Sequence, residues 1–427
     1  MRVLNLMPLQ NRWMNSVYIV ILEISGLTTG ETFSRLVAIG SNNEYRVCDR
    51  RLLAGGVFFC FHYAMAKKKI LIFSLDYLPG TISGAESAIQ DITDRISPDD
   101  MEFHMVTMYY NSDVSRVEKF GNVTCHYVGL FGRPDPSLEE RKKMPLHLNK
   151  YYFQFAAGIK GWRLHRKYKY DGAWAMMAHG AGVPVTIFNI LTGVPYALSL
   201  QEGDPPEHIE RIARPVWPLF KRAFTHATVL QAISDFLADW GKRMGYSREI
   251  PIIRDGANPG NLKADFPKEA AEKIKRELGK KDGDVYLLIA ARLVHQKAID
   301  VVIKAMKLLP AHVHFIILGG GPDEDKLKKL AHDEGVSDRV KFLGQIEREE
   351  VPKYRNRIVA DIFVHPSRSE GLGHTCLSAM AGYLPLVATQ VGGMRDFVFD
   401  EKRNPDKETT AWAVDPESPE QIADAVK

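Results

Sequence analysis

Apolar runs alternate with longer stretches of mixed polarity from residue 69 to the end of this chain. Each run ends at glycine, proline or polar residues, and a stretch with helical spacing of its apolar positions follows before the next run. Runs of this kind predict buried strands, and the stretches between them predict helices. We expect strands at residues 70–75, 103–109, 123–128, 173–178, 196–200, 226–233, 250–253, 285–290, 313–318, 340–342, 361–364 and 386–388.

The predicted helices are long enough to cross from one parallel strand to the next. They lie at residues 85–96, 151–168, 182–191, 235–244, 268–278, 298–309, 323–334, 347–357 and 375–381. Strand–helix–strand units of this length form right-handed crossovers and build parallel sheets. The sequence therefore predicts an α/β protein with two Rossmann-like domains that face each other across a cleft.

Two segments stand apart from this alternation. Residues 1–64 have no clear period and no convincing helix caps, so we expect an N-terminal extension of irregular structure. Residues 133–150 are rich in charge and proline, which predicts a mobile loop. The turn-rich segment 254–267 predicts a hinge, so we expect domains over 65–255 and 256–427.

Composition narrows the class of protein. The chain has 427 residues, 45% of them hydrophobic, which is enough for two cores of ordinary size. Its net charge of +4 gives no reason to expect nucleic acid as a partner. The four cysteines have no metal-ligand spacing, and no apolar run reaches the roughly 18 to 20 residues that span a bilayer. We therefore expect a reduced, cytoplasmic protein.

One motif follows the strand expected at 361–364. Ser369-Glu-Gly-Leu-Gly-His-Thr375 places an acidic residue and two glycines where a parallel strand ends and a helix begins. Open α/β sheets bind ligands at this edge, and the N–H groups of a helix start attract anions. Glu370 would hold sugar hydroxyls or stabilise positive charge at an anomeric carbon. A solvated loop carboxylate is the alternative.

Other candidates have the same position at a strand end. Arg292 and Lys297 follow the strand expected at 285–290 and suit a diphosphate, although ordinary surface cations would look the same. Glycines follow the next strand and open the first helix, where a ligand or only a turn would explain them equally well. These glycines are Gly319, Gly320 and Gly84.

The first half offers polar residues of its own. Gln201, Glu202 and Asp204 follow the strand expected at 196–200, so we expect them to face the cleft. His179 follows the strand expected at 173–178 and has a similar position. A lone histidine is more often structural than catalytic, so both interpretations of His179 stay open.

Together these residues resemble the retaining glycosyltransferases of family 4, which have the GT-B fold. The resemblance runs from about residue 67 to the end. It is carried by Arg292 and Lys297, by the glycine turn at 319–322, by Pro366-Ser367, and by Glu370-Gly-Leu-Gly followed by Ser378-Ala-Met-Ala. It implies a UDP-, GDP- or ADP-sugar donor held by the C-terminal domain and a glycan or lipid-linked acceptor held by the N-terminal domain.

The resemblance also implies roles for single residues. Glu370 would contact the donor sugar, Gly84 would approach the phosphates, and Arg292 and Lys297 would neutralise the departing diphosphate without an obligatory metal. The backbone N–H groups of one loop would help them. These belong to Gly371, Leu372, Gly373, His374 and Thr375.

Three features depart from the family pattern. Ser378 stands where the family has a second glutamate that holds the ribose, so a charge-assisted hydrogen bond of about 1.5–3 kcal/mol would be lost. Gln201 stands where many members have a histidine of the catalytic site. The chain ends at Lys427, before the last helices that the resemblance implies, so we expect a truncated C-terminal domain.

Two other functions stay open. A nucleotide-sugar 2-epimerase would need carboxylates on both sides of the cleft, and Glu202 or Asp204 with Glu370 would supply them. A degenerate nucleotide-sugar-binding subunit is suggested by Ser378 and Gln201. Peripheral contact with the inner membrane face also stays open, although no basic amphipathic helix in the sequence demands it.

Overall fold

The computed structural model describes residues 67–78, 84–254, 256, 268–347 and 350–427, together with two short strands near the N-terminus. These strands, β1 (Val37–Ile39) and β2 (Tyr45–Val47), pair antiparallel. The chain divides into two compact units, Met1–Ala66 and Lys67–Lys427. Apart from these two strands, the extension predicted for residues 1–64 lies outside the described residues.

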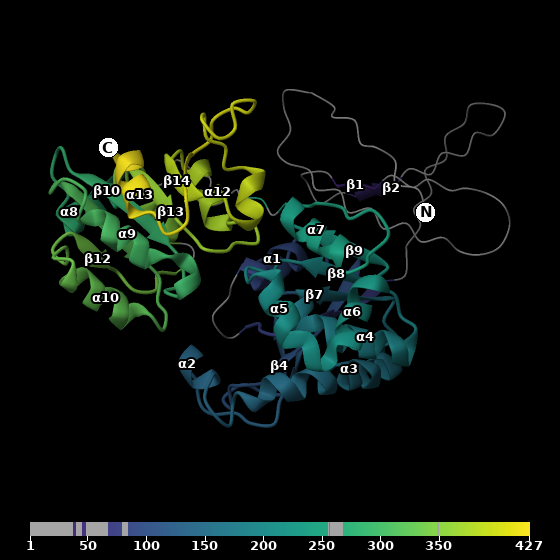
Figure 1. Ribbon diagram of the computed structural model, residues 1–427. Helices are drawn as coiled ribbons and strands as arrows, with labels where there is room; N and C mark the ends of the chain where they lie inside the picture. The colour runs from purple at the N-terminus through teal and green to yellow at the C-terminus, as the bar shows by residue number, and fades with distance from the viewer. Residues whose placement is uncertain are drawn as a thin grey trace. The chain divides into compact units, whose positions relative to one another are not determined.

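The first half of the larger unit is built on a seven-stranded sheet (Figure 1). Its order is β5-β6-β4-β3-β7-β8-β9, and every pair is parallel except β5 with β6. The strands are β3 (Lys68–Phe73), β4 (Met101–Met108), β5 (Val117–Phe120), β6 (Val123–Val128), β7 (Gly172–Met176), β8 (Tyr196–Leu200) and β9 (Val229–Ala232). The helices are α1 (Gly84–Thr93), α2 (Leu138–Arg141), α3 (Leu148–Tyr168), α4 (Ala178–Thr192), α5 (Pro206–Ala213), α6 (Trp217–Thr225) and α7 (Asp235–Arg243), with a 3₁₀ turn η1 (Arg214–Val216).

Small residues let the two long helices of this half approach closely. A Cβ on Gly158 of α3 would lie 2.7 Å from the Cβ of Ile187 on α4, and one on Gly161 would lie 2.7 Å from the Phe73 ring of β3. Phe153 and Phe188 fill the same core and are fully buried. Close packing of this kind fixes α3 and α4 on one face of the sheet.

The second half is built on a six-stranded sheet in which all pairs are parallel. Its order is β12-β11-β10-β13-β14-β15. The strands are β10 (Val285–Ala290), β11 (Val313–Leu318), β12 (Val340–Phe342), β13 (Ile362–His365), β14 (Leu386–Thr389) and β15 (Trp412–Val414). The helices are α8 (Lys268–Leu278), α9 (Ile299–Met306), α10 (Glu324–Asp333), α11 (Val351–Tyr354), α12 (His374–Ala381) and α13 (Pro419–Val426), with 3₁₀ turns η3 (His295–Lys297) and η4 (Gly392–Asp396).

In each sheet, the order in which the chain adds strands reverses at one internal position. In the second half the chain runs outward from β10 to β12 and then returns to start again at β13, beside β10. In the first half the same reversal separates β3 from β7. Ligands of doubly wound sheets bind at the carboxyl ends of the two strands that flank this switch point. The strand order therefore directs attention to the loops after β3, β7, β10 and β13.

The predicted fold class, two Rossmann-like α/β sheets, is confirmed. Two local expectations differ from the structure. The expected mobile loop at 133–150 contains α2 and the start of α3. The strand expected at 250–253 is reduced to an isolated bridge between Ala232 and Ile252. Pro251 has no N–H to donate, and a strand that contains proline forms an incomplete ladder.

Candidate active site

A buried carboxylate with three hydrogen-bond donors lies at the carboxyl end of β13. Oε1 of Glu370 accepts hydrogen bonds from Lys297 Nζ at 2.6 Å, from His365 Nε2 at 2.6 Å and from Ser367 Oγ at 2.9 Å. Glu370 is 7% exposed, and His365 and Ser367 are buried. Because a carboxylate oxygen only accepts, the His365 contact requires a proton on Nε2.

These donors fix the charge of Glu370. Burial alone would raise the pKa of this carboxyl, but the Lys297 ammonium and the His365 ring hold the pKa well below its usual range. The opposite charge and the hydrogen bonds favour the ionised form, and they outweigh the loss of hydration. Glu370 is therefore a carboxylate with a fixed position and a fixed negative charge.

The two cations expected at the switch point differ in their contacts. Lys297 belongs to η3 and is committed to Glu370. Arg292 lies two residues after the end of β10 and is exposed, and its side chain makes no hydrogen bond or ion pair with any residue that the structure describes. An exposed guanidinium with all of its donors available suits a phosphate-bearing ligand.

Glycines hold the Arg292 loop in place. Gly319 has φ +130°, and a Cβ there would lie 2.0 Å from the carbonyl oxygen of Ala291. A Cβ on Gly321 would lie 2.4 Å from the carbonyl oxygen of Leu293. A Cβ on Gly320 meets nothing within 4 Å. Gly319 and Gly321 therefore serve the packing of this loop, whereas the Cβ position of Gly320 is open.

The first turns of two helices from different halves of the chain meet near His374. The helix α12 begins at His374 after Gly373, whose φ is +90°. The helix α1 begins at Gly84, where a Cβ would lie 2.8 Å from His374 Nδ1. Helix N-termini carry partial positive charge and unsatisfied N–H groups. Their convergence favours an anion at this position. Thr375 lies in the same first turn and is half-buried.

The loop before α12 touches the first half of the chain. A Cβ on Gly371 would lie 2.2 Å from the carbonyl oxygen of Glu202, and Ser369 Oγ donates to the carbonyl oxygen of Gly203 at 2.9 Å. The Leu372 side chain is buried within the apolar cluster of the first half. Only the backbone of Leu372 is therefore available to a ligand, and its side chain joins the two halves.

Ser378 uses its hydroxyl within the helix. Its Oγ donates to the carbonyl oxygen of His374 one turn earlier, at 3.0 Å, and the residue is half-buried. The oxygen can still accept a hydrogen bond, but its proton is engaged. A ribose hydroxyl would find here a weaker partner than a carboxylate.

Glu202 is turned toward the start of α4. Its Oε1 accepts from the N–H of Ala178 and, at 3.3 Å, from that of His179, and Met177 bends the chain there with φ +63°. Burial raises the pKa of the Glu202 carboxyl to about 7, and the backbone hydrogen bonds only partly offset this. Its Oε2 is buried and has no hydrogen-bond partner among the described residues.

The other polar residues predicted for the first half are less enclosed. The carbonyl Oε1 of the Gln201 side chain is buried without a hydrogen-bond partner in the described part of the chain. His179 is half-buried, and burial lowers the pKa of its imidazole despite the opposing charge of Asp204. Asp204 itself is exposed.

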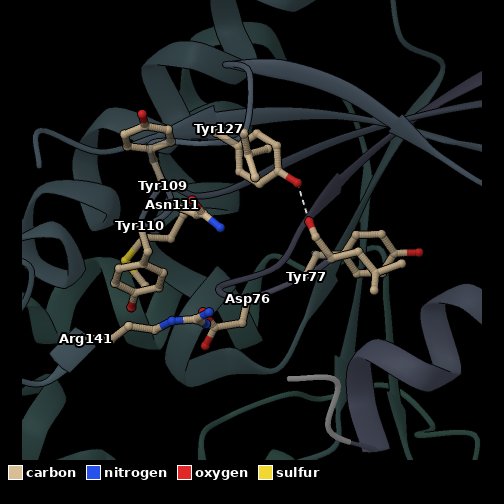
Figure 2. A pocket seen from close by; sticks show the side chains of 10 residues that line it. Asp76, Tyr77, Tyr109, Tyr110, Asn111, Tyr127 and Arg141 are labelled. Carbon is tan, nitrogen blue, oxygen red and sulfur yellow. Dashed lines mark hydrogen bonds between the residues drawn. The ribbon is translucent and has the colours of Figure 1, made fainter. Parts of the chain in front are cut away.

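The sequence analysis missed two groups. His365 is the last residue of β13, five residues before Glu370, and its place at a strand end was an available signal. Asp76 follows β3 at the other switch point and lines a small pocket of about 20 Å³ with tyrosines and Arg141 (Figure 2). Burial raises the pKa of Asp76 against the field of Arg141, Lys150 and Arg292. Among the described residues, no group of three or more His, Cys, Asp or Glu side chains is arranged to hold a metal ion.

Known proteins resemble part of this chain in sequence. The family described as glycosyl transferases group 1 matches residues 270–427. An uncharacterized glycosyltransferase of Methanocaldococcus jannaschii is 33% identical over 177 residues, which are 39% of this chain and 44% of the relative. The GDP-mannose-dependent alpha-(1-6)-phosphatidylinositol monomannoside mannosyltransferase of Mycobacterium tuberculosis is 33% identical over 193 residues, 43% of this chain and 47% of the relative. The chain spans about half the length of the relatives it matches.

Solved structures resemble both halves. HepE of Anabaena, in complex with UDP and glucose, has a TM-score of 0.62 at 20% identity and covers 84% of this chain and 88% of its own. Sucrose-phosphate synthase of Thermosynechococcus elongatus has a TM-score of 0.68 at 18% identity, with coverage of 84% and 89%. At these identities the likeness shows the fold alone. Residues 270–427 of the chain match the glycosyl transferases group 1 family, and its two described α/β sheets have the GT-B fold.

Proposed function

We propose that this protein is a retaining glycosyltransferase that moves a sugar from a nucleoside-diphosphate sugar to a glycan or lipid-linked acceptor. One observation carries the proposal. The ionised Glu370, the unpaired Arg292 and the starts of α1 and α12 all lie at the strand ends where doubly wound sheets bind ligands.

The positive groups suit a departing diphosphate. Arg292 offers a planar fork of donors to phosphate oxygens, and the two helix starts add N–H groups and partial positive charge. Lys297 is bound to Glu370 at 2.6 Å, so its charge holds that carboxylate in place and does not act on the diphosphate directly. Fixed donors in a site that excludes water stabilise the charge that develops on the leaving group, by several kcal/mol.

Glu370 suits the sugar of the donor. Lys297, His365 and Ser367 all bind Oε1, so the other carboxylate oxygen is the one that would accept hydroxyl protons of the sugar. Its fixed negative charge would also stabilise an anomeric carbon that gains positive charge. Retention at that carbon follows from the family resemblance.

The names of related proteins suggest donor and acceptor classes. Relatives include a GDP-mannose-dependent mannosyltransferase acting on a phosphatidylinositol monomannoside and an alpha-monoglucosyldiacylglycerol synthase of Acholeplasma laidlawii. HepE of Anabaena was solved with UDP-glucose. We propose a UDP- or GDP-sugar donor, with an ADP-sugar less supported, and an acceptor borne by a lipid at a membrane face.

The other two candidate functions differ from the proposed one in what they require of the site. An epimerase would use Glu202 as an acid or base, but Glu202 is 2% exposed and is bound to the start of α4. A degenerate subunit fits Ser378, whose proton is engaged within α12. Such a subunit would also use Arg292 and Glu370 to bind the donor, so turnover with an acceptor is the measurement that separates it from a transferase.

Calorimetric titration of UDP, GDP and ADP tests the phosphate site. We expect one nucleotide to bind, and Arg292→Ala to weaken it at least about tenfold, because a charge-assisted hydrogen bond is worth about 1.5–3 kcal/mol. Arg357→Ala removes an exposed arginine that precedes β13, at the opposite edge of the sheet, and should bind like the parent.

Product analysis tests the reaction. Incubation with the matching nucleotide-sugar and a lipid-linked acceptor should release the nucleoside diphosphate and give a product with the donor's anomeric configuration. An epimerised donor without acceptor would support the epimerase. Nucleotide binding without turnover on any acceptor would support the degenerate subunit.

A further inference from the structure

One segment of the first half carries basic charge without any acid. Between residues 141 and 169 there is no Asp or Glu, although the chain as a whole is nearly balanced. The basic residues of this segment are Arg141, Lys142, Lys143, Lys150, Lys160, Arg163, Arg166, Lys167 and Lys169. A local excess of this size creates a positive field over α3 and the turn before it.

The same segment exposes large apolar side chains on one face of α3. The exposed fractions are 63% for Tyr151, 41% for Tyr152, 47% for Phe155 and 41% for Ile159. These positions recur at the three- and four-residue spacing that places side chains on one side of a helix. Arg163 and Arg166 continue the same exposed face toward the end of the helix.

The opposite face of α3 is already occupied. Phe153, Ala157 and Leu164 are buried in the core, and Gly158 and Gly161 allow the close approach to α4 and β3. The exposed side chains are therefore not core residues left partly uncovered. They form a second apolar stripe, for which the described residues provide no cover.

Neighbouring loops extend this stripe. Leu130 and Phe131 are exposed, and their N–H groups donate to Oδ1 of Asn149 in the first turn of α3, at 2.9 and 3.1 Å. Met144 is 68% exposed and Leu148, which starts the helix, is 37% exposed. We call these side chains, together with the exposed stripe and the basic residues of 141–169, the α3 face.

We propose that the α3 face docks on the surface of an anionic lipid bilayer. The basic residues match negatively charged headgroups, each contributing about 1 kcal/mol of attraction, or about fivefold in binding. The aromatic and aliphatic side chains would enter the boundary between headgroups and acyl chains, as in helices that lie in the plane of a membrane. No helix among the described residues is both long and apolar enough to cross a bilayer.

The aliphatic members of the face favour lipid over nucleic acid. Tyrosine and phenylalanine can stack on bases. Met144, Leu148 and Ile159 have no ring, and they gain free energy only when hydrocarbon or another apolar surface removes them from water. The combination of basic charge with exposed aliphatic groups is typical of an interfacial membrane contact.

The α3 face also adjoins the pocket after β3. Arg141 lines this pocket and begins the basic segment, and Asn149 Nδ2 donates to the carbonyl oxygen of Tyr109, another lining residue, at 2.8 Å. Figure 2 shows Asp76, Tyr110 and Arg141 gathered on one side of the pocket. If the proposed transfer is correct, docking would bring a hydroxyl-bearing lipid headgroup to Asp76, whose carboxylate makes no hydrogen bond or ion pair with the described residues.

Flotation with lipid vesicles tests the docking surface on the full chain. The protein should float with vesicles of phosphatidylglycerol and phosphatidylcholine and remain unbound with phosphatidylcholine alone. Two triple variants, Tyr151→Ser/Phe155→Ser/Ile159→Ser and Arg163→Glu/Arg166→Glu/Lys167→Glu, should each reduce binding at least about tenfold. Nucleotide titration and circular dichroism should remain those of the parent, which shows that the variants are folded.

Matched controls change similar side chains elsewhere. Ile212→Ser/Leu308→Ser removes exposed aliphatic groups of α5 and of the turn after α9, and Lys273→Glu/Lys326→Glu reverses exposed charges of α8 and α10. Both should float like the parent. The proposal would be overturned if the controls lost as much binding as the α3 variants, or if the α3 variants bound like the parent. Tighter binding to duplex RNA than to the vesicles would also overturn it, as would dimers that the apolar triple variant abolishes. Nucleotide binding that fails while flotation persists would count against the proposed function alone.

Discussion

Glu370 and Glu202 are both buried, yet their surroundings act on their charge in opposite directions. An ammonium, a ring N–H and a hydroxyl converge on Glu370 and hold its pKa low. Glu202 has two backbone N–H groups and no cation in contact, so burial dominates and raises its pKa to about 7. The first carboxyl therefore keeps a negative charge for a ligand, whereas the second changes charge near neutral pH.

The raised pKa of Glu202 makes stability depend on pH. The folded state holds this proton up to about pH 7, whereas the unfolded chain releases it near 4.5. Stability should therefore fall as pH rises between these values, by at most about 3 kcal/mol, and then level off. Glu202→Gln keeps an acceptor for the Ala178 N–H but cannot titrate. Urea unfolding from pH 4.5 to 8 should show a smaller fall for the variant, and parallel curves would contradict the raised pKa.

Ser378 offers a test of the ribose position. Ser378→Glu would give a ribose hydroxyl a charged acceptor, so we expect nucleoside diphosphate binding to tighten roughly tenfold. Calorimetric titration measures this change. Ser378→Gln has the same length without the charge and should tighten binding less. Unchanged or weaker binding by the Glu variant would mean that residue 378 does not face the ribose.

The sequence predicted those site residues whose position follows from a strand end. Glu370, Lys297 and Arg292 were recognised because each follows a continuous apolar run. The hydrogen bonds from His365 and Ser367 to Glu370 depend on side-chain directions inside a tight turn, which periodicity does not describe. Asp76 was passed over because its importance comes from a second switch point, and strand order is not visible in sequence.

The accurately predicted strands are mostly inside the two sheets, with the edge strand β12 as an exception. The bounds of β6, β8, β10, β11 and β12 agree with the predicted ones. The edge strands β5 and β15 were not predicted, because each is short and contains exposed residues. The helices α5 and α6, which begin at or beside prolines, were also not predicted.

The exposed apolar stripe of α3 illustrates the same limit. Apolar residues on both sides of a helix give no clear amphipathic pattern, so the sequence indicated only a helical, aromatic segment. The structure separates the two sides, because Gly158 and Gly161 face α4 and β3 while Phe155 and Ile159 are exposed. Which side of a helix is covered depends on its neighbours in the fold.

The glycine turn after β11 supports the phosphate site through its packing. Gly319→Ala would place a Cβ 2.0 Å from the Ala291 carbonyl oxygen, at a φ of +130° that side chains rarely adopt. We expect a loss of roughly 2 kcal/mol or more in stability, and weaker nucleotide binding because the Arg292 loop must move. Gly320→Ala adds the same methyl group in open space and should change neither quantity. Thermal unfolding and calorimetric titration measure both variants, and equal effects would contradict this packing role.

At the scale of the larger unit, the two α/β halves are joined by the loops that surround the candidate site. Asp396 of η4 accepts from the Asp235 N–H at the start of α7 at 3.0 Å and from Arg254 Nη2 at 2.9 Å. Leu372 is buried in the apolar cluster of the first half. A ligand held at the start of α12 is thus held by a loop that also connects the halves, so ligand binding and the contact between halves should be coupled.

Removal of Asp396 tests this coupling. Asp396→Ala leaves the Asp235 N–H without its acceptor and removes one partner of the half-exposed Arg254, so we expect a loss of about 1–2 kcal/mol. The two halves should then unfold separately, and calorimetry should resolve two transitions where the parent shows one. Added nucleoside diphosphate should raise the unfolding temperature of the second half and leave that of the first half unchanged. Asp406→Ala removes an exposed acid of the same half that has no described partner, and it should unfold like the parent. A single transition in Asp396→Ala at the parent's midpoint would mean that Leu372 and the contacts of Gly371 hold the halves together without this ion pair.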